Sequence, residues 1–147
     1  TLGSIGRAPY APGTWGTLPG LLLYALAFVW LPLWAQIVGL VLLFFLGVWL
    51  TDRAEKELGL ADPGCIVLDE AIAVPVCFLG LAASTPTRFI LLLAAAFALF
   101  RLFDALKPPP IRQIQHLPGG WGCCIDDLLA ALATCACLHA IGLVVPW

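Results

Sequence analysis

Five long apolar runs, separated by short polar or Pro- and Gly-containing segments, make up most of this sequence. They cover residues 18–31, 33–50, 66–83, 89–106 and 125–145. A helix needs about 17–25 apolar residues to cross the ~30 Å hydrocarbon core of a bilayer. The last four runs meet this length, whereas the first reaches only about 21 Å at 1.5 Å per residue. The pattern therefore predicts an all-α, polytopic membrane bundle of about five helices, with the first run tilted or half-spanning.

Composition supports a membrane protein with a single domain over residues 1–147. Of the 147 residues, 62% are apolar and 11% are charged, whereas soluble domains carry about 25% charged residues. The mean hydropathy is +1.02. A net charge of −2 and the lack of a basic stripe with interleaved aromatic residues give no indication of nucleic-acid binding. The expected surroundings are therefore the lipid bilayer, and nucleic acid is not an expected partner.

Alternate passage of the five runs through a bilayer places nearly all charged side chains on one side. The basic residues on that side are Arg7, Arg53, Lys56, Arg101, Lys107 and Arg112, and only Arg88 falls on the other. The positive-inside rule makes the first side cytoplasmic. All nine acidic residues share it, namely Asp52, Glu55, Glu57, Asp62, Asp69, Glu70, Asp104, Asp126 and Asp127. Among them, Asp52 pairs with Lys56 at i,i+4, which indicates a solvated helix extension.

Two acidic pairs, Asp69-Glu70 and Asp126-Asp127, each follow a glycine-containing turn and lie inside a predicted helix. Carboxylates in apolar helices are costly unless they face a metal, a polar cavity or the headgroup layer. Small residues stand four positions on, so two such helices can converge on a hard cation such as Mg²⁺. Adjacent helical residues point about 100° apart, so one acid of each pair is expected to ligate and the other to support it or act as a base. The alternative is that both pairs are solvated interfacial carboxylates.

A third segment places Arg101, Asp104 and Lys107 three residues apart, on one face of a helix that ends before three prolines. Such a face can bind phosphate through Arg101 and Lys107, with Asp104 orienting them or ligating a metal. The alternative is a structural ladder of ion pairs with Lys107 extended to the interface.

A fourth segment, residues 11–18, is rich in Gly and Thr and is expected to be a loop that enters a helix. Exposed amides at a helix N-terminus suit an anion, and the Thr14 and Thr17 hydroxyls would be further donors. Ordinary N-capping by Thr17 is the alternative.

The cysteines and histidines add little chemistry. The six cysteines lack the spacing of a zinc site, so we expect packing roles and no redox role. His139 is expected to be a packed or interfacial residue, whereas His116 is a candidate for assisting proton transfer. A Ser/His/Asp hydrolase is not indicated, because few serines are available to pair with the histidines.

In this order, the four segments resemble the phosphatidylglycerophosphatase A family of bacterial membrane lipid phosphatases. The resemblance runs from about Gly6 to Ala131. Its motifs are Ala11-Pro12-Gly13-Thr14-x-Gly16-Thr17, Asp62-Pro63 through Ile66-Val67-x-Asp69-Glu70, Phe100-Arg101-x-Phe103-Asp104-x-x-Lys107-Pro108-x-Pro110-Ile111, and Gly119-Gly120-x-Gly122 through Asp126-Asp127. The sequence departs from the family at Ala73 and Ala131, where Gly is usual, and at Cys123-Cys124, where apolar residues are usual. Exchange of one small residue for another should preserve helix approach.

The resemblance implies Mg²⁺-dependent hydrolysis of phosphatidylglycerol phosphate to phosphatidylglycerol and inorganic phosphate, in glycerophospholipid synthesis. It implies a multi-pass protein of the bacterial inner membrane whose active site faces the cytoplasm, with the lipid tails between helices. The expected metal ligands are Asp69, Glu70, Asp126 and Asp127. The expected phosphate-binding residues are Arg101, Lys107, Thr14 and Thr17. The expected catalytic residues are Asp69, Asp104 and Asp127.

Several alternatives stay open at the level of sequence. Water could attack the phosphorus directly, or an aspartyl-phosphate could form first. The number of metal ions, the role of each acid and the oligomeric state are not indicated. A different class of function, a small cation transporter or channel subunit, would use the acids as an ion path. Such a path should continue polar residues through the outer half of the membrane, which is almost purely apolar here.

Overall fold

In the computed structural model, residues 12–59, 66–109, 111–114, 117–144 and 147 are described. Their helices are α1 (Pro12–Leu26), α2 (Leu33–Leu58), α3 (Leu68–Ala73), α4 (Pro86–Leu106), α5 (Ile111–Ile114) and α6 (Gly120–Gly142), with two 3₁₀ turns, η2 (Phe28–Trp30) and η3 (Val74–Phe78). Four helical segments are long and apolar enough to cross a membrane: Gly13–Trp30, Leu33–Leu58, Pro86–Leu106 and Gly120–Gly142. The expectation of an all-α bundle with membrane-spanning helices is confirmed for this part of the chain.

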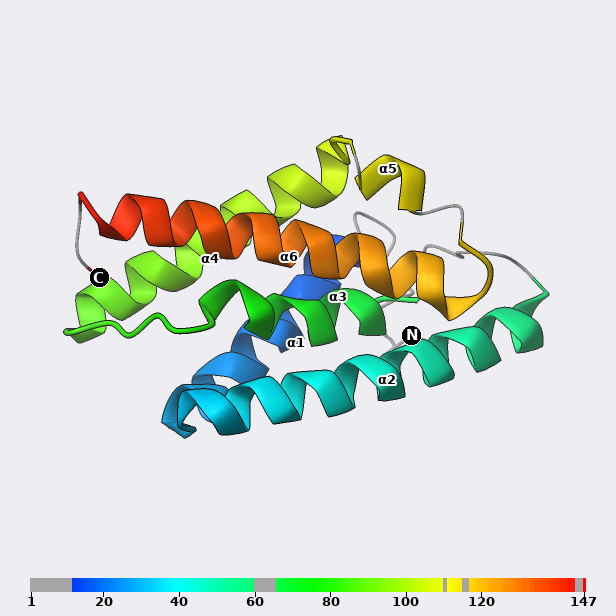
Figure 1. Cartoon of the computed structure of the whole chain (residues 1–147), viewed down its shortest axis with the longest axis horizontal. Helices are drawn as coiled ribbons and strands as arrows, with labels where there is room; N and C mark the ends of the chain where they lie inside the picture. The colour runs from blue at the N-terminus through cyan, green and yellow to red at the C-terminus, as the bar shows by residue number, and fades with distance from the viewer. Residues whose placement is uncertain (1–11, 60–65, 110, 115–116, 145–146) are drawn as a thin grey trace.

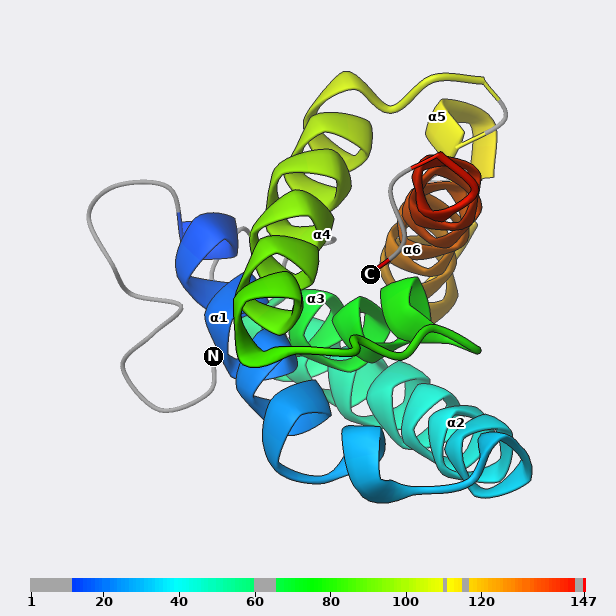
Figure 2. The same ribbon diagram turned by 90° about the vertical axis from the view of Figure 1, so that its left-hand side faces the viewer.

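The short segment α3–η3 lies at the centre of the bundle, with α1, α2, α4 and α6 around it (Figures 1 and 2). Every residue from Ala71 to Phe78 is buried. The starts of α3 and α6 and the ends of α2 and α4 lie at one end of the bundle (Figure 1). We call this the site end.

The third apolar run is not the continuous spanning helix that its length predicts. The α-helix ends at Ala73, continues as the 3₁₀ turn η3 to Phe78, and gives way to a non-helical stretch over residues 79–85. Pro75 explains the break, because proline lacks the amide hydrogen and its ring clashes with the carbonyl four residues earlier. The run still connects the two ends of the bundle, since α4 begins at the end opposite the site (Figure 1).

Backbone polar groups at membrane depth need hydrogen-bond partners within the protein. In the non-helical stretch, side chains of neighbouring helices supply partners for two carbonyl groups. Nε2 of His139 lies 2.9 Å from the Leu79 carbonyl oxygen, and the Tyr24 hydroxyl donates to the Leu81 carbonyl at 3.4 Å. Outside the helices, the Trp147 carbonyl accepts a hydrogen bond from the Ser84 backbone N–H at 3.2 Å. His139 is therefore a structural residue, as expected.

The first two helices are longer than their apolar runs. Because α1 begins at Pro12, the expected loop over residues 11–18 is helical over its described part. The α2 helix runs past the membrane segment to Leu58, where Gly59 closes it in a left-handed conformation at φ 65°. On this extension Lys56 and Asp52 form the expected exposed i,i+4 pair at 2.6 Å.

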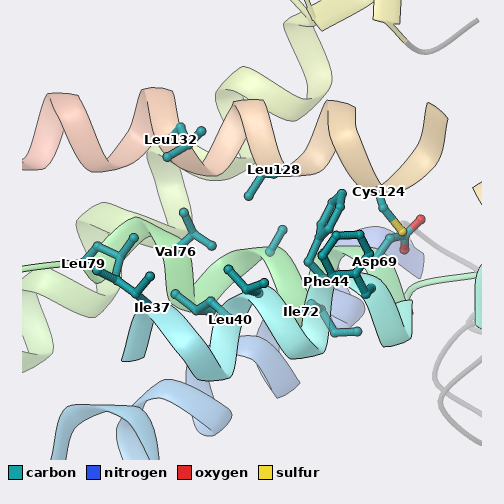
Figure 3. Close-up of a pocket in the computed structure, with 13 residues that line it drawn as sticks. Ile37, Leu40, Phe44, Asp69, Ile72, Val76, Leu79, Cys124, Leu128 and Leu132 are labelled. Carbon is teal, nitrogen blue, oxygen red and sulfur yellow. The ribbon is translucent and has the colours of Figure 1, made fainter. Parts of the chain in front are cut away.

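An apolar groove runs between α2, α3–η3 and α6, from Asp69 and Cys124 at the site end to Ile37 and Leu79 at the other (Figure 3).

Glycines let α1 approach α3 closely. A Cβ on Gly20 would lie 2.6 Å from Cβ of Val74 and 2.8 Å from the Ala71 carbonyl oxygen. Gly39 on α2 offers a contrast, since a Cβ there would meet nothing nearer than the Phe28 ring at 3.4 Å.

We expect Gly20→Ala to lower the thermal stability of the detergent-solubilised protein relative to Gly39→Ala. Both changes gain about 1 kcal/mol of helix propensity, but only the first overpacks the α1–α3 contact, at a cost of about 1–3 kcal/mol. Melting temperatures of the two variants measure the difference. A Gly20→Ala protein as stable as Gly39→Ala would contradict the close approach.

Candidate active site

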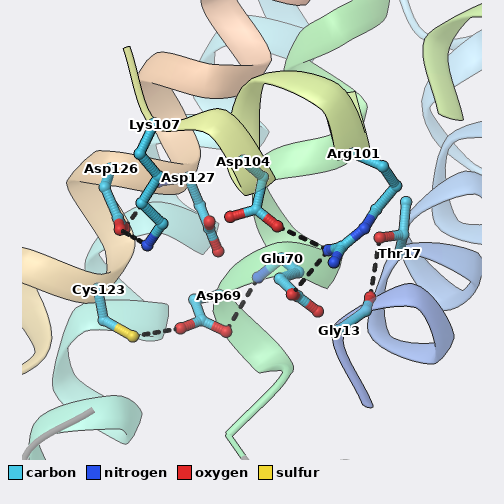
Figure 4. A network of polar contacts seen from close by, with 10 residues as sticks. All are labelled: Gly13, Thr17, Asp69, Glu70, Arg101, Asp104, Lys107, Cys123, Asp126 and Asp127. Carbon is cyan, nitrogen blue, oxygen red and sulfur yellow. Dashed lines mark hydrogen bonds and ion pairs between the residues drawn. The ribbon is translucent and has the colours of Figure 1, made fainter. Parts of the chain in front are cut away.

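Seven charged side chains gather at the site end of the bundle (Figure 4). Their sources are α3, α4 with the residue that follows it, and α6. They are Asp69, Glu70, Arg101, Asp104, Lys107, Asp126 and Asp127. The structure therefore brings together three of the four segments that the sequence singles out, as expected from their shared side of the membrane.

The α3 pair lies in the first turn of its helix, because residues 66 and 67 are not helical. Asp69 is 4% exposed. Its Oδ1 accepts a hydrogen bond from the backbone N–H of Glu70 at 3.0 Å, and its Oδ2 accepts one from the Cys123 thiol at 2.6 Å. Asp69 is thus held in a fixed orientation from two helices.

Glu70 is enclosed between α1 and α4. One oxygen, Oε1, pairs with Nη1 of Arg101 at 3.0 Å. The other, Oε2, is buried and has no hydrogen-bond partner among the described residues. Gly13 and Gly16 make the space, because a Cβ on either would collide with this carboxylate. A buried carboxylate oxygen without a partner is unusual in a folded protein and is consistent with a role in binding or catalysis.

The face of α4 carries one of the two expected ion pairs. Nη1 of Arg101 lies 2.7 Å from Oδ2 of Asp104, so the same guanidinium nitrogen holds both Asp104 and Glu70. Lys107 instead turns to α6, where its ammonium lies 2.5 Å from Oδ2 of Asp126. Of the ion-pair ladder proposed as the alternative, the Arg101–Asp104 pair is therefore present and the Asp104–Lys107 pair is replaced by Lys107–Asp126.

Lys107 reaches Asp126 from a strained backbone. It is the non-glycine residue with positive φ in the described part of the chain, at φ 41° and ψ 60°. A left-handed conformation costs a residue with a side chain about 1–2 kcal/mol. Pro108 favours it by disfavouring the right-handed helical region for the preceding residue. Burial tends to lower the pKa of Lys107, but its hydrogen bond to Asp126 and the nearby charges of Asp126, Asp104 and Asp127 leave it raised.

The α6 pair repeats part of the α3 arrangement. Oδ1 of Asp126 accepts a hydrogen bond from the Asp127 backbone N–H at 2.9 Å, and Asp126 and Asp127 are 3% and 5% exposed. The glycine-rich turn before them enters the helix as predicted, with Gly119 at φ 64°. No hydrogen bond or ion pair joins the Asp127 carboxylate to the described residues, although Asp69, Asp104, Asp126 and Glu70 lie near enough to repel its charge.

The cluster therefore carries an excess of negative charge. Five carboxylates face two cations, Arg101 and Lys107, within the described residues. If all the carboxylates ionised, three negative charges would be left without a matching cation. Burying like charges together is unfavourable unless protons or cations neutralise them.

The chemical type of these donors suits a hard cation, but their positions do not form a complete coordination site. All are carboxylate oxygens, the ligand type that Mg²⁺ prefers. One oxygen of Glu70 is orphaned. Among the described side chains, however, no three His, Cys, Asp or Glu residues stand close enough together to hold a metal ion. The donor set therefore matches a divalent cation in chemistry but not in the spacing of the described side chains.

The threonines of α1 differ from the sequence expectation. Thr17 is fully buried inside the helix, and its hydroxyl donates to the Gly13 carbonyl at 2.9 Å. N-capping by Thr17 is therefore wrong, because the helix already begins at Pro12. Thr14 is half-buried in the first turn. Phosphate binding by these two residues stays a prediction, and for Thr17 it requires the hydroxyl to rotate away from Gly13.

Sequence reasoning missed Cys123 and the two glycines that enclose Glu70. The cysteines were expected only to pack, and the five described ones form no disulfide bond with one another, but the Cys123 thiol also donates to Asp69. Its position beside an acidic pair was the available signal. Asp62 and His116 lie outside the described residues.

Comparison with known proteins gives one consistent family. The model of the family described as phosphatidylglycerophosphatase A matches residues 1–142. A phosphatidylglycerophosphatase A of Haemophilus influenzae is 42% identical over 134 residues, which cover 89% of this chain and 78% of the relative. The Escherichia coli protein of the same name is 34% identical over 139 residues, covering 93% and 77%. A Bacteroides thetaiotaomicron protein, named as a proposed phosphatidylinositol-3-phosphatase, is 36% identical over 131 residues, covering 86% and 80%. No solved structure matches.

We expect Asp127→Asn to raise the melting temperature in the presence of a chelator. The neutral amide removes a repelled buried charge at nearly constant shape, and each kcal/mol gained corresponds to about 2–4 °C. Differential scanning fluorimetry of the detergent-solubilised protein measures the change.

Asp126→Asn is the matched control, and it should lower the melting temperature because it removes the partner of Lys107. We expect a loss of at least about 1 kcal/mol, below the ~3–5 kcal/mol of a fully buried pair, since the Lys107 side chain is 25% exposed. The reverse order of the two variants would contradict the charge assignment.

Proposed function

The chain belongs to the phosphatidylglycerophosphatase A family, and we propose that it hydrolyses phosphatidylglycerol phosphate to phosphatidylglycerol and inorganic phosphate with the help of Mg²⁺. The coarser activity, hydrolysis of a phosphoric monoester, follows from the family. One structural observation carries the finer proposal. Buried acids and two cations converge at one end of a bundle of membrane-spanning helices, where a lipid headgroup would lie.

Arg101 and Lys107 are the residues to bind the phosphate. Both side chains are a quarter exposed, so each can reach a ligand without leaving its carboxylate partner. A guanidinium suits two phosphate oxygens at once, whereas an ammonium acts as a point charge. Asp104 orients Arg101 through their 2.7 Å contact.

Asp69, Glu70, Asp126 and Asp127 are the residues to hold Mg²⁺. The orphaned oxygen of Glu70 and the unbalanced charge of the cluster support this assignment. When bound, the ion would offset phosphate charge and lower the pKa of a bound water.

Asp127 is the group we propose to react. Its carboxylate faces the cluster and is not committed to a described partner (Figure 4). It accepts the proton of a water that attacks the phosphorus opposite the leaving glycerol oxygen, or it attacks the phosphorus itself and forms an aspartyl-phosphate that water then hydrolyses. In both routes the ester P–O bond breaks, and the glycerol oxygen takes up a proton from solvent water.

We further propose that the site faces the cytoplasm of the bacterial inner membrane. Five described basic residues lie on α2, α4, α5 or the turn after α4, at or near the site end: Arg53, Lys56, Arg101, Lys107 and Arg112. At the opposite end, Arg88 is the one described Lys or Arg. The positive-inside rule supports this orientation.

The identity of the headgroup alcohol is the part of the proposal with the least support, because one relative is named for an inositol lipid. Phosphate binding by Arg101 and Lys107 does not depend on the alcohol to which the phosphate is attached. The assay therefore compares phosphatidylglycerol phosphate with phosphatidylinositol 3-phosphate, and the proposal expects a higher kcat/KM for the former.

We expect the purified protein to release phosphate from phosphatidylglycerol phosphate with Mg²⁺ and to lose that activity with a chelator. Asp127→Asn and Asp69→Asn should each lower kcat by at least about 100-fold, because supporting residues of metal sites already contribute 10–100-fold. Colorimetric phosphate release in mixed micelles measures the rates.

Glu57→Gln is the control, since Glu57 is exposed on the α2 extension and should stay within about twofold of wild type. Wild-type rates for both Asp variants would refute the metal site. A wild-type protein that releases no phosphate but carries Mg²⁺ into liposomes would favour the transporter alternative.

A further inference from the structure

The apolar groove of Figure 3 meets the charged cluster at one end. Its volume is about 230 Å³. Asp69 and Cys124 close the site end, and Ile37, Leu79 and Leu132 line the far end. Asp69 is the one charged residue in a lining that is otherwise apolar apart from the Cys124 thiol. The groove therefore leads from hydrocarbon directly to a carboxylate of the site.

The length and level of the groove match one leaflet of a membrane. From Cys124 to Leu132 along α6 the rise is about 12 Å at 1.5 Å per residue, against about 15 Å for half of a ~30 Å hydrocarbon core. Trp121 packs edge-on against Phe44 and Phe45, with ring centroids 6.1 and 6.2 Å away. Tryptophan at this end is typical of the headgroup level.

We propose that this groove holds one acyl chain of the lipid phosphate substrate, with the headgroup at Asp69 and the chain end near Ile37 and Leu79. The inference rests on the proposed function, since it identifies how that lipid is held. Continuity with the charged cluster selects the occupant, because a molecule that fills both parts must join a long hydrocarbon chain to a polar head, and in the proposed function Arg101 and Lys107 bind that head as a phosphate.

The groove acts by orientation rather than by hydrophobic attraction. Lipid tails are already as apolar as the groove wall, so entering it gains van der Waals contact but little transfer free energy. What the groove provides is a fixed path for the chain, which sets the depth and direction of the phosphate. Small errors in the position of a reacting group can cost about 100-fold in rate.

Two valines on α2 give a matched pair of variants. Val41 lines the groove and is 49% exposed, whereas Val38, one turn away, does not line it and is 51% exposed. Val41→Trp places an indole midway along the groove, and Val38→Trp places the same group on the neighbouring lipid-facing surface.

The experiment measures kcat/KM for phosphatidylglycerol phosphate with sixteen-carbon and with six-carbon acyl chains, the latter too short to run the length of the groove. We expect Val41→Trp to lower the long-to-short ratio by at least about tenfold, and Val38→Trp to leave it at the wild-type value. Equal ratios for the two variants would overturn the inference while leaving the proposed function intact.

A second measurement does not depend on turnover. A long-chain phosphatidylglycerol phosphate with a diazirine at mid-chain should, on irradiation, label the groove-lining residues Leu40, Phe44 and Leu128 in preference to Ile90 and Leu91, which are exposed on α4. Phosphatidylcholine with the same diazirine should show no such preference. Indistinguishable labelling by the two lipids would overturn the groove assignment, whereas groove labelling without phosphate release would refute only the proposed function.

Discussion

The structure is organised around buried negative charge that its own cations do not balance. Five carboxylates and two cations share one end of the bundle, and three of the carboxylates are nearly inaccessible to water. Coulomb repulsion is strong where water is excluded, so such a cluster persists only if its surroundings hold it in place. The shared guanidinium of Arg101 and the strained backbone of Lys107 both serve this purpose. A cation bound among these carboxylates would reduce the repulsion between them.

Close helix packing is what encloses this charge. Gly13, Gly16 and Gly20 bring α1 against α3, so that the Glu70 side chain lies between α1 and α4 and is only 12% exposed. Small residues are the usual means by which membrane helices approach closely. The same contact buries Val74, near the start of the central η3 turn. Charge burial and helix packing are thus one feature of this protein and not two.

The sequence predicts which residues gather at the site end better than it predicts how they contact one another. Charged residues in apolar helices have few favourable positions, so threading the runs through a bilayer was enough to bring Asp69, Asp104 and Asp127 together. The Lys107–Asp126 pair was not predicted, because it depends on a left-handed residue and on how α4 and α6 are placed relative to each other. The break in the third run was missed even though Pro75 is visible in the sequence. A proline breaks a membrane helix in this way only where neighbouring helices donate hydrogen bonds to the backbone carbonyls that the break leaves without partners.

That break connects the charged cluster to the membrane. Non-helical backbone is tolerated at this depth only where protein groups satisfy it, as the His139 ring does for the Leu79 carbonyl. The first turn of the interrupted segment carries Asp69, and Val76 and Leu79 at its other end line the groove. Discontinuous helices place binding sites within membranes in other proteins as well. One short segment at the centre of the bundle therefore fixes both the carboxylate at the head of the groove and the wall along which a chain would lie.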